Sequence, residues 1–430
     1  MSDAKRKFGF ETRMLHAGHV PDAVTGSRAV PIYQTTSYVF DDADQAANLF
    51  ELKEYGNIYT RINNPTTAAF EERVASLENG TGALATSSGM AAQLVTMMTL
   101  LQPGDEIVAS SHLYGGTVTQ FTHTFRKLGV KCHFVDPTEI DNWAAAITPN
   151  TKALYGETIG NPKGSILDFE AVSDLANAHK IPLIVDNTFA TPYLCRPLDF
   201  GAEIVVHSAT KFIGGHGNSI GGIIVDSGRF DFSHFETIAA PSPAYHDLKF
   251  YETFGHYGFL MKARTETLRD TGSSISPFNA FLLIQGLETL SVRMDRHVAN
   301  AQTIAGFLDE HPRIAWVAYA GLPDSPYHDL AKKYLPKGPG AIFTFGIKSE
   351  NPRQAGKEFI ESLHLFSHLA NVGDARSLVI HPGSTTHQQL SDEELAAAGV
   401  DAGMVRLSIG MESTEDLIWD LDQALLAISA

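Results

Sequence analysis

One lysine stands where its amine could bond covalently to a ligand. Lys211 follows an apolar run, residues 204–206, and ends the stretch Ser208-Ala209-Thr210-Lys211 just before a glycine-rich loop. Another apolar run, residues 181–185, ends in Asp186. A lysine that is partly removed from water deprotonates readily, and its free amine can form a Schiff base with an aldehyde. Most lysines are solvated surface charges, but a surface lysine has little reason to lie between an apolar strand and glycines.

The neighbouring residue types fit one cofactor, pyridoxal 5'-phosphate. Asp186 could pair with the pyridine nitrogen and keep it protonated, so that the ring withdraws electrons from a bound substrate. Thr188 could hydrogen-bond the ring's 3-oxygen or the Asp186 carboxylate, and the hydroxyls of Ser208 and Thr210 could bind the phosphate. The alternative for Asp186 is a strand-end carboxylate that caps the next turn.

A second stretch is suited to binding the phosphate. Ser87-Ser88-Gly89-Met90-Ala91-Ala92 joins a predicted strand to a predicted helix. Glycine lets the backbone approach an anion, and the start of the helix supplies free N–H groups and a positive dipole end. Ser88, Gly89 and Met90 are therefore predicted to contact the phosphate. Because any strand-to-helix turn favours serine and glycine, this motif alone is only moderately specific.

Three more side chains could contact the same cofactor. Tyr114 follows a predicted strand and could stack on the pyridine ring, although it could also be a core tyrosine. Arg61 could bind the phosphate through two N–H groups, and Tyr59 could add a hydroxyl donor. Both lie outside the predicted sheet, so they could serve a neighbouring subunit's site. The alternative is a helix-capping turn that begins at Asn64 or Thr66.

A buried cation is predicted near the C-terminus. Arg406 lies within the apolar strand pattern of residues 404–409, where an arginine is costly unless it is paired. The α-carboxylate of an amino-acid substrate would be a suitable partner, and Asn161 and Ser377 could help to hold it. The alternative is an ion pair within the protein. The 18 histidines show no metal-binding spacing, so no metal is expected.

Alternating strand and helix patterns must position these residues. The predicted strands are apolar runs at 82–86, 106–109, 152–155, 182–186, 202–207 and 220–225. Runs that are apolar throughout are typical of parallel strands buried on both faces. Alternation with helices therefore predicts an α/β fold, with a large, mostly parallel sheet covered by helices on both faces.

The chain is predicted to contain three regions. Residues 1–65 show little periodicity and are expected to form an extended N-terminal arm. Residues 66–285 are predicted to form the cofactor-binding α/β domain, with an insertion at about 226–275 that is expected to cover the entrance to the site. Residues 286–430 are predicted to form a smaller α+β C-terminal domain.

Composition limits the possible classes of protein. With 43% hydrophobic and 19% charged residues, the 430-residue chain has the composition of a soluble globular protein. A net charge of −17 argues against general nucleic-acid binding. The two distant cysteines, Cys132 and Cys195, favour a reducing compartment such as the cytoplasm. The chain has no run of about 18 apolar residues, so no membrane span is expected. The first residues lack the apolar segment of a secretion signal.

Taken in order, these motifs resemble the Cys/Met-metabolism family of pyridoxal phosphate enzymes, which have the aspartate-aminotransferase-like fold. The strings that carry the resemblance extend over essentially the whole chain: YTRINNPT, SSGMAA, HLYGGT, ETIGNP, VDNTFATPY, HSATKFIGGHGN and VRLSIGMES. The resemblance implies a homotetramer built from two tight dimers, in which Tyr59 and Arg61 reach the partner chain's site.

Within the family, the chain resembles the branch that acts on O-acetylhomoserine. The resemblance rests on the length of the chain and on three strings, GGHGN, SPFNAFLLIQGLETL and NVGDARSLVIHP. This implies a γ-replacement in which sulfide or methanethiol displaces acetate, with Lys211 as the group that moves protons. Cystathionine γ-synthase and methionine or cystathionine γ-lyase activities stay open, although methionine γ-lyases usually carry a cysteine where this chain has Gly116. The acetyl or succinyl nature of the ester and the physiological sulfur donor also stay open.

A nucleotide-binding or NAD-dependent α/β protein is the competing class. It is disfavoured because the chain has no G-x-G-x-x-G after a first strand and no P-loop lysine motif.

Overall fold

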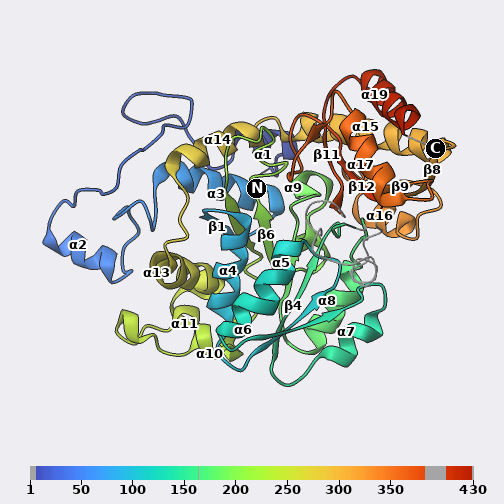
Figure 1. The fold of residues 1–430 in the computed structure, drawn as a ribbon. Coiled ribbons are helices and arrows are strands. Elements are labelled where there is room, and N and C mark those ends of the chain that lie inside the picture. Colours follow the sequence, from blue (N-terminus) through green and yellow to red (C-terminus); the bar gives the residue numbers. More distant parts are fainter. Residues whose placement is uncertain (1–5, 163, 383–402, 429–430) are drawn as a thin grey trace.

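The computed structural model describes residues 6–162, 164–382 and 403–428 and contains two sheets (Figure 1). The strands of the larger sheet lie in the order β1-β7-β6-β5-β4-β2-β3. Their bounds are β1 (Gly82–Thr86), β2 (Glu106–Ser110), β3 (Lys131–Val135), β4 (Thr151–Glu157), β5 (Leu183–Asp186), β6 (Ile204–Ser208) and β7 (Gly222–Asp226). Only β7 runs against the others, so the carboxyl ends of β1 to β6 meet at one edge.

Both faces of this sheet are covered. Val185 and Val205 point into one apolar core, while Ile184 and Val206 point into another. The first core includes side chains of α3 (Pro65–Glu78) and α8 (Phe169–Ala178), and the second includes side chains of α4 (Gly89–Leu100). Adjacent strand residues are therefore both buried, which explains the uninterrupted apolar runs. The prediction of a mostly parallel sheet between helices is confirmed.

The smaller sheet has the strand order β10-β11-β12-β9-β8. Its strands are β8 (Ile314–Ala318), β9 (Ile342–Ile347), β10 (Ser367–His368), β11 (Leu378–Ile380) and β12 (Met404–Ser408). It is packed with α15 (Leu290–Glu310), α17 (Pro352–Ser362) and α19 (Thr414–Ala427). Figure 1 shows this unit beside the upper end of the larger sheet.

The remaining helices are short connections around the two sheets. They are α1 (Phe10–His16), α2 (Ala43–Phe50), α5 (Gly115–Thr119), α6 (Phe125–Lys127), α7 (Ile140–Ala146), α9 (Thr191–Leu194), α10 (Glu236–Ala239), α11 (Phe250–Phe254), α12 (Gly258–Lys262), α13 (Arg269–Thr271), α14 (Pro277–Leu287) and α16 (His328–Tyr334). The described residues also contain two π-helical turns, η1 (Gln120–Thr124) and η6 (Ala263–Leu268), and four 3₁₀ turns, η2 (Pro197–Phe200), η3 (Phe232–His234), η4 (Pro243–Tyr245) and η5 (Gly255–Tyr257). None of the described helices combines the length and apolar composition needed to cross a bilayer.

The N-terminal arm contains only the short helices α1 and α2 and otherwise lacks regular structure. In Figure 1 the part that carries α2 extends away from the body. Several apolar side chains on this part are open to solvent, with Val24 92%, Val39 97% and Tyr55 85% exposed. Exposed apolar side chains gathered on one segment are typical of a surface that contacts another protein chain.

Local chemistry explains where α3 and α4 begin. Asn64 accepts hydrogen bonds from the N–H groups of Thr66 and Thr67, and Pro65 occupies the first helical position of α3. The capping turn considered as the alternative for this stretch is therefore present. Ser88 caps α4 in the same way by accepting from the N–H of Ala91 at 3.1 Å.

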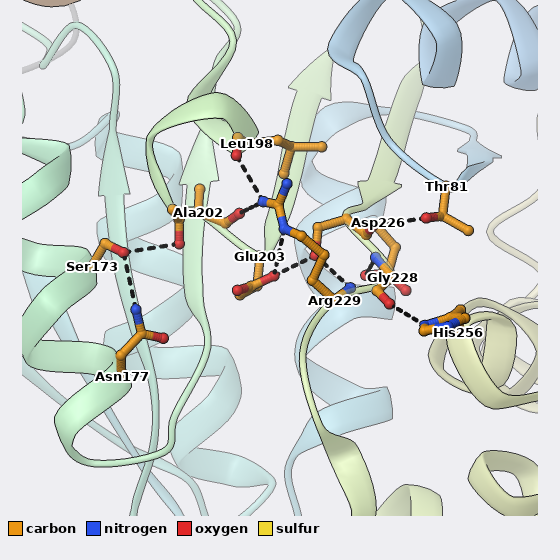
Figure 2. Close-up of polar contacts among 12 residues, drawn as sticks. Thr81, Ser173, Asn177, Leu198, Ala202, Glu203, Asp226, Gly228, Arg229 and His256 are labelled. Atoms are coloured by element: carbon orange, nitrogen blue, oxygen red, sulfur yellow. Dashed lines mark hydrogen bonds and ion pairs between the residues drawn. The ribbon is translucent and has the colours of Figure 1, made fainter. Parts of the chain in front are cut away.

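A polar cluster around the buried Asp226 lies at the start of β6 and the end of β7 (Figure 2). Asp226 is fully buried, and its Oδ1 accepts a hydrogen bond from the N–H of Gly228 at 3.0 Å. Its Oδ2 is buried with no hydrogen-bond partner among the described residues. Nearby, Arg229 donates to the carbonyl oxygens of Leu198 and Ala202. Burial and the neighbouring Glu203 raise the pKa of Asp226 to about 7.

This cluster predicts a pH-dependent stability. The pKa of Asp226 in the folded state, about 7, lies above its ordinary value of 3.8. The folded protein therefore holds this proton more tightly than the unfolded chain does, and stability is lost as the pH rises from about 4 to about 7. Because Asp226→Asn cannot ionise, its free energy of unfolding relative to wild type should rise by up to about 4 kcal/mol between these pH values. Denaturant unfolding at both pH values measures this, and a relative gain for wild type at high pH would contradict it.

Candidate active site

A cavity of about 280 Å³ lies where the carboxyl ends of the parallel strands meet the smaller sheet. Ligands of open α/β sheets bind at this edge because the strand-end turns gather there. Most of the predicted site residues line the cavity: Ser88, Gly89, Met90, Tyr114, Asn161, Asp186, Thr188, Ser208, Thr210, Lys211 and Arg406. They come from the ends of β1, β2, β4, β5 and β6 and from β12.

The Lys211 amine is partly buried and is oriented by the smaller domain. Its Nζ donates a hydrogen bond to Oδ1 of Asn371, in the loop between β10 and β11. Gly373 allows this loop to come close, since a Cβ at that position would lie 2.7 Å from the backbone nitrogen of Phe212. Burial lowers the pKa of Lys211, and the nearby Arg406 charge adds to this effect. The amine is thus more readily neutral, which is the form that can attack a carbonyl or take up a proton.

The Asp186 carboxylate ends β5 and is held by hydrogen bonds. Thr188 donates both its N–H, at 2.9 Å, and its hydroxyl to Oδ1. Gln93 Nε2 lies 3.3 Å from Oδ2 and 2.8 Å from the hydroxyl of Tyr155. Burial raises the pKa of Asp186, while the bonds from Thr188 and Gln93 oppose that effect by favouring the ionised form.

The start of α4 and the end of β6 form one wall of the cavity. A Cβ on Gly89 would lie 2.7 Å from Cβ of Ser208, so only glycine lets these two segments approach so closely. The N–H of Ser208 donates to Oγ1 of Thr188 at 2.8 Å, and Thr210 is hydrogen-bonded to the backbone of Gly221. The wall therefore combines a helix N-terminus with hydroxyl side chains, a combination suited to a phosphate group.

Arg406 lies on β12 and faces the cavity from the opposite side. Its Nη1 donates to Oδ1 of Asn161 at 3.2 Å. Within the described part of the chain no carboxylate forms an ion pair with it, and burial lowers its pKa to about 10. A buried guanidinium without an anion is unfavourable, so this side chain is poised to bind an anionic group.

Comparison with known proteins agrees with this geometry. Residues 11–426 match the family described as Cys/Met metabolism PLP-dependent enzyme. The chain belongs to this family. It is 52% identical to an O-acetyl-L-homoserine sulfhydrylase of Leptospira meyeri, over 98% of this chain and 97% of the relative. It is also 52% identical to a homocysteine synthase of Schizosaccharomyces pombe, over 97% of this chain and 98% of the relative.

A solved structure extends the likeness to three dimensions. A crystal structure of a putative O-acetylhomoserine (thiol)-lyase from Campylobacter jejuni, which carries a pyridoxyl-lysine phosphate group, has a TM-score of 0.94 with this chain. The two chains are 40% identical, and the match covers 97% of this chain and 100% of the Campylobacter jejuni chain. The predicted fold and the predicted cofactor, pyridoxal phosphate, are therefore confirmed. The close approach at Gly89, the Lys211 amine and the Asp186 carboxylate fit the cofactor's phosphate, aldehyde and pyridine nitrogen.

Three of the predicted site residues, Ser377, Arg61 and Tyr59, do not line the cavity. Ser377 is fully buried but does not line the cavity, because its hydroxyl donates to Glu412 and accepts from the N–H of Gly410. Arg61 and Tyr59 border a separate hollow, where Arg61 donates to the carbonyl oxygen of Arg269 at 2.8 Å. The structure of a single chain therefore does not bring these three side chains to the cofactor cavity.

Three polar residues of the described lining, Asn371, Gln93 and Glu157, were not predicted from the sequence. Asn371 carries no local signal, because it lies in a loop that only the packing of the two domains brings to Lys211. Gln93 lies one helical turn beyond Met90, so helical periodicity could have placed it beside the turn predicted to bind phosphate. Glu157 ends an apolar strand just as Asp186 does, and the same argument could have identified it.

The insertion does not line the cavity. No residue between 221 and 369 belongs to the lining. Instead, apolar side chains of this segment, including Phe232, Phe250 and Phe259, pack in the core on the α4 side of the sheet. Its end does reach the turn before α4, where the N–H of Ser87 donates to the carbonyl oxygen of Ser273 at 2.7 Å. The expected covering of the entrance is therefore not seen within one chain.

Gly116 determines where the Tyr114 ring lies. A Cβ at this position would lie 2.4 Å from Cε1 of Tyr114, and the ring is 52% exposed, so it can turn away. Gly116→Ala should therefore displace the ring without unfolding the protein, and kcat/KM should fall by up to about tenfold if the ring stacks on the cofactor. Gly115→Ala is the matched control, since nothing lies within 4 Å of its Cβ position. Equal activity of the two variants would contradict the prediction.

Proposed function

We propose that this enzyme converts O-acetyl-L-homoserine and sulfide to L-homocysteine and acetate, and that methanethiol in place of sulfide yields L-methionine. The observation that carries the proposal is a cation, Arg406, which has no ion-pair partner among the described residues and faces the Lys211 amine across one cavity. An α-amino acid fits this pair, because its carboxylate binds the guanidinium while its amine lies near the cofactor. The names of the relatives at 52% identity support the choice of substrate.

The side chains have distinct tasks in this reaction. Arg406 and Asn161 bind the substrate's α-carboxylate and so fix the direction of the Cα–H bond. Lys211 takes the Cα proton on Nζ and returns protons later, and the lowered pKa of its amine suits this role. Asn371 orients the amine through its Oδ1. The bound cofactor supplies a ring that takes up the negative charge developing on the substrate carbons.

The cofactor is positioned by the remaining lining residues. Asp186 holds the pyridine nitrogen, and Thr188 holds Asp186. Tyr114 stacks on the ring. The start of α4 with Ser88, Gly89 and Met90 binds the phosphate together with Ser208 and Thr210. In the net reaction the Cγ–O bond breaks, acetate leaves with the electron pair, and hydrosulfide forms the Cγ–S bond.

Tyr59 and Arg61 complete the site of a neighbouring subunit in a homotetramer built as a dimer of dimers. The exposed apolar side chains of the arm and the distance of Arg61 from its own cavity support this assembly. The division at residues 65 and 285, the binding of substrate by Ser377 and the cytoplasmic location stay predictions. The contact between Ser377 and Glu412 supports a role for Ser377 in bracing the strand that carries Arg406.

A substrate panel tests the proposed activity. Purified holoenzyme is supplied with O-acetylhomoserine, O-succinylhomoserine or O-acetylserine, each with sulfide, methanethiol or cysteine, and the products are identified. Homocysteine from O-acetylhomoserine and sulfide is expected to dominate. Preferential formation of cystathionine with cysteine, or of 2-oxobutanoate without a nucleophile, would replace the proposed activity with that of a synthase or a lyase.

A further inference from the structure

Glu157 is a carboxyl group in the floor of the cavity that the proposed reaction does not use. It ends β4, is only 8% exposed and lines the cavity. It is in register with Asp186 on the neighbouring parallel strand. Paired residues of adjacent strands project from the same face of a sheet, so the two carboxyl groups are neighbours.

Burial of the Glu157 carboxyl group is energetically unfavourable. No ion pair holds Glu157 among the residues that the structure describes. Burial, together with the charge of Asp186, raises the pKa of Glu157 well above its ordinary value. A buried carboxyl beside another carboxyl is less favourable than an apolar side chain of similar size. Packing alone therefore gives no reason for a glutamate at this position.

The hydrogen bonds of Glu157 do give a reason. Its Oε1 accepts the backbone N–H of Tyr114 at 2.6 Å, and the backbone N–H of Asn161 also acts on the carboxyl, where it favours the ionised form and lowers its pKa. These residues belong to separate segments, one before α5 and the other in the loop that follows β4. Tyr114 supplies the exposed ring over the cavity, and Asn161 holds Arg406 through its side chain. The Glu157 carboxyl group therefore connects the segment that carries the Tyr114 ring to the segment that carries Asn161, the partner of Arg406.

We propose that Glu157 is a positioning residue that sets the Tyr114 ring and the Asn161–Arg406 pair relative to each other. Loss of its carboxyl then disturbs ring stacking on the cofactor and binding of the substrate carboxylate together. This inference rests on the roles given to these residues in the proposed function, but not on the identity of the ester or of the sulfur donor. The charged acceptor matters because hydrogen bonds to a carboxylate are stronger than those to a neutral oxygen.

The test compares holoenzyme carrying Glu157→Ala or Glu157→Gln with wild type. L-Norvaline is the probe, because it has the α-amino and α-carboxylate groups but no leaving group. Its dissociation constant is measured from the change in cofactor absorbance. The visible circular dichroism of the bound cofactor reports how the ring is held, and thermal unfolding reports stability. Asp226→Asn is the matched control, since it alters another buried carboxyl of the same sheet outside the cavity.

Glu157→Ala should alter the visible dichroism and raise the dissociation constant of L-norvaline by about tenfold or more, because one lost charged hydrogen bond is worth about that factor. Glu157→Gln should give a smaller change in both, since its amide oxygen can still accept one of the two N–H groups. The control should leave both signals unchanged. The inference is overturned if the Glu157 variants lose only thermal stability, or if only one of the two signals changes. Failure of the substrate panel alone would overturn the proposed activity and leave this inference standing.

Discussion

Lys211→Ala is expected to lower kcat for homocysteine formation by about 10³-fold or more, because it removes the amine that, alone among the described lining residues, can take and return the Cα proton. The variant should fold normally. The Lys211 amine is partly buried, and its one hydrogen bond within the described residues goes to Asn371. Truncation therefore removes a group whose charged form is disfavoured by its surroundings.

Steady-state kinetics with O-acetylhomoserine and sulfide measure this effect, and thermal unfolding checks the fold. Lys249→Ala is a suitable control, since that lysine is in an exposed ion pair with Glu252. Added small primary amines should restore part of the activity of Lys211→Ala, because they can enter the cavity and carry the proton. Turnover within about tenfold of wild type would show that another group moves the proton, and would remove Lys211 from that role.

Arg406→Met should reduce kcat/KM by about 10²- to 10³-fold, mainly through a weaker affinity for the substrate carboxylate, because a buried charge pair is lost. The same change should leave the melting temperature unchanged or raise it. Within the described chain Arg406 has no anionic partner, and burial lowers its pKa to about 10, so the protein without substrate holds an uncompensated cation. A gain in stability with a loss of binding is typical of a residue kept for function.

Substrate kinetics, L-norvaline binding and thermal unfolding measure the two opposite effects. Arg406→Lys should give an intermediate loss of affinity for the substrate carboxylate, since lysine keeps the positive charge but cannot form the bidentate hydrogen bonds of a guanidinium. A melting temperature lowered by several degrees in Arg406→Met would instead indicate that the guanidinium forms a structural ion pair, which is the alternative considered from the sequence.

Short-range chemistry made much of the site predictable. Asp186 ends an apolar strand, Ser88 and Gly89 start a helix, and Lys211 follows a strand into glycines. Each signal depends only on residues within one strand-to-helix turn, and parallel strands bring all such turns to one edge of the sheet. The structure places all of these residues around one cavity.

Longer-range features could not be predicted in the same way. The loop with Asn371 and Ser377 shows this most clearly. Both residues are polar and lie between β10 and β11, and nothing in their local pattern tells which one faces the cavity. The approach permitted by Gly373 turns Asn371 toward Lys211, whereas Glu412 and the Gly410 N–H hold Ser377 away. The insertion is a similar case, because its aromatic residues pack beside α4 and away from the entrance.

The sequence by itself therefore determined the fold class, the family resemblance, the cofactor and the strand-end residues that face it. These depend on apolar periodicity and turn chemistry, which are local properties of the chain. Only the tertiary structure decided that Arg406 lacks an anionic partner within the described chain, that Asn371 contacts Lys211 and that Glu157 joins Tyr114 to Asn161. Such contacts depend on how one domain packs against the other and on strand register. Both are set by the burial of many distant side chains at once.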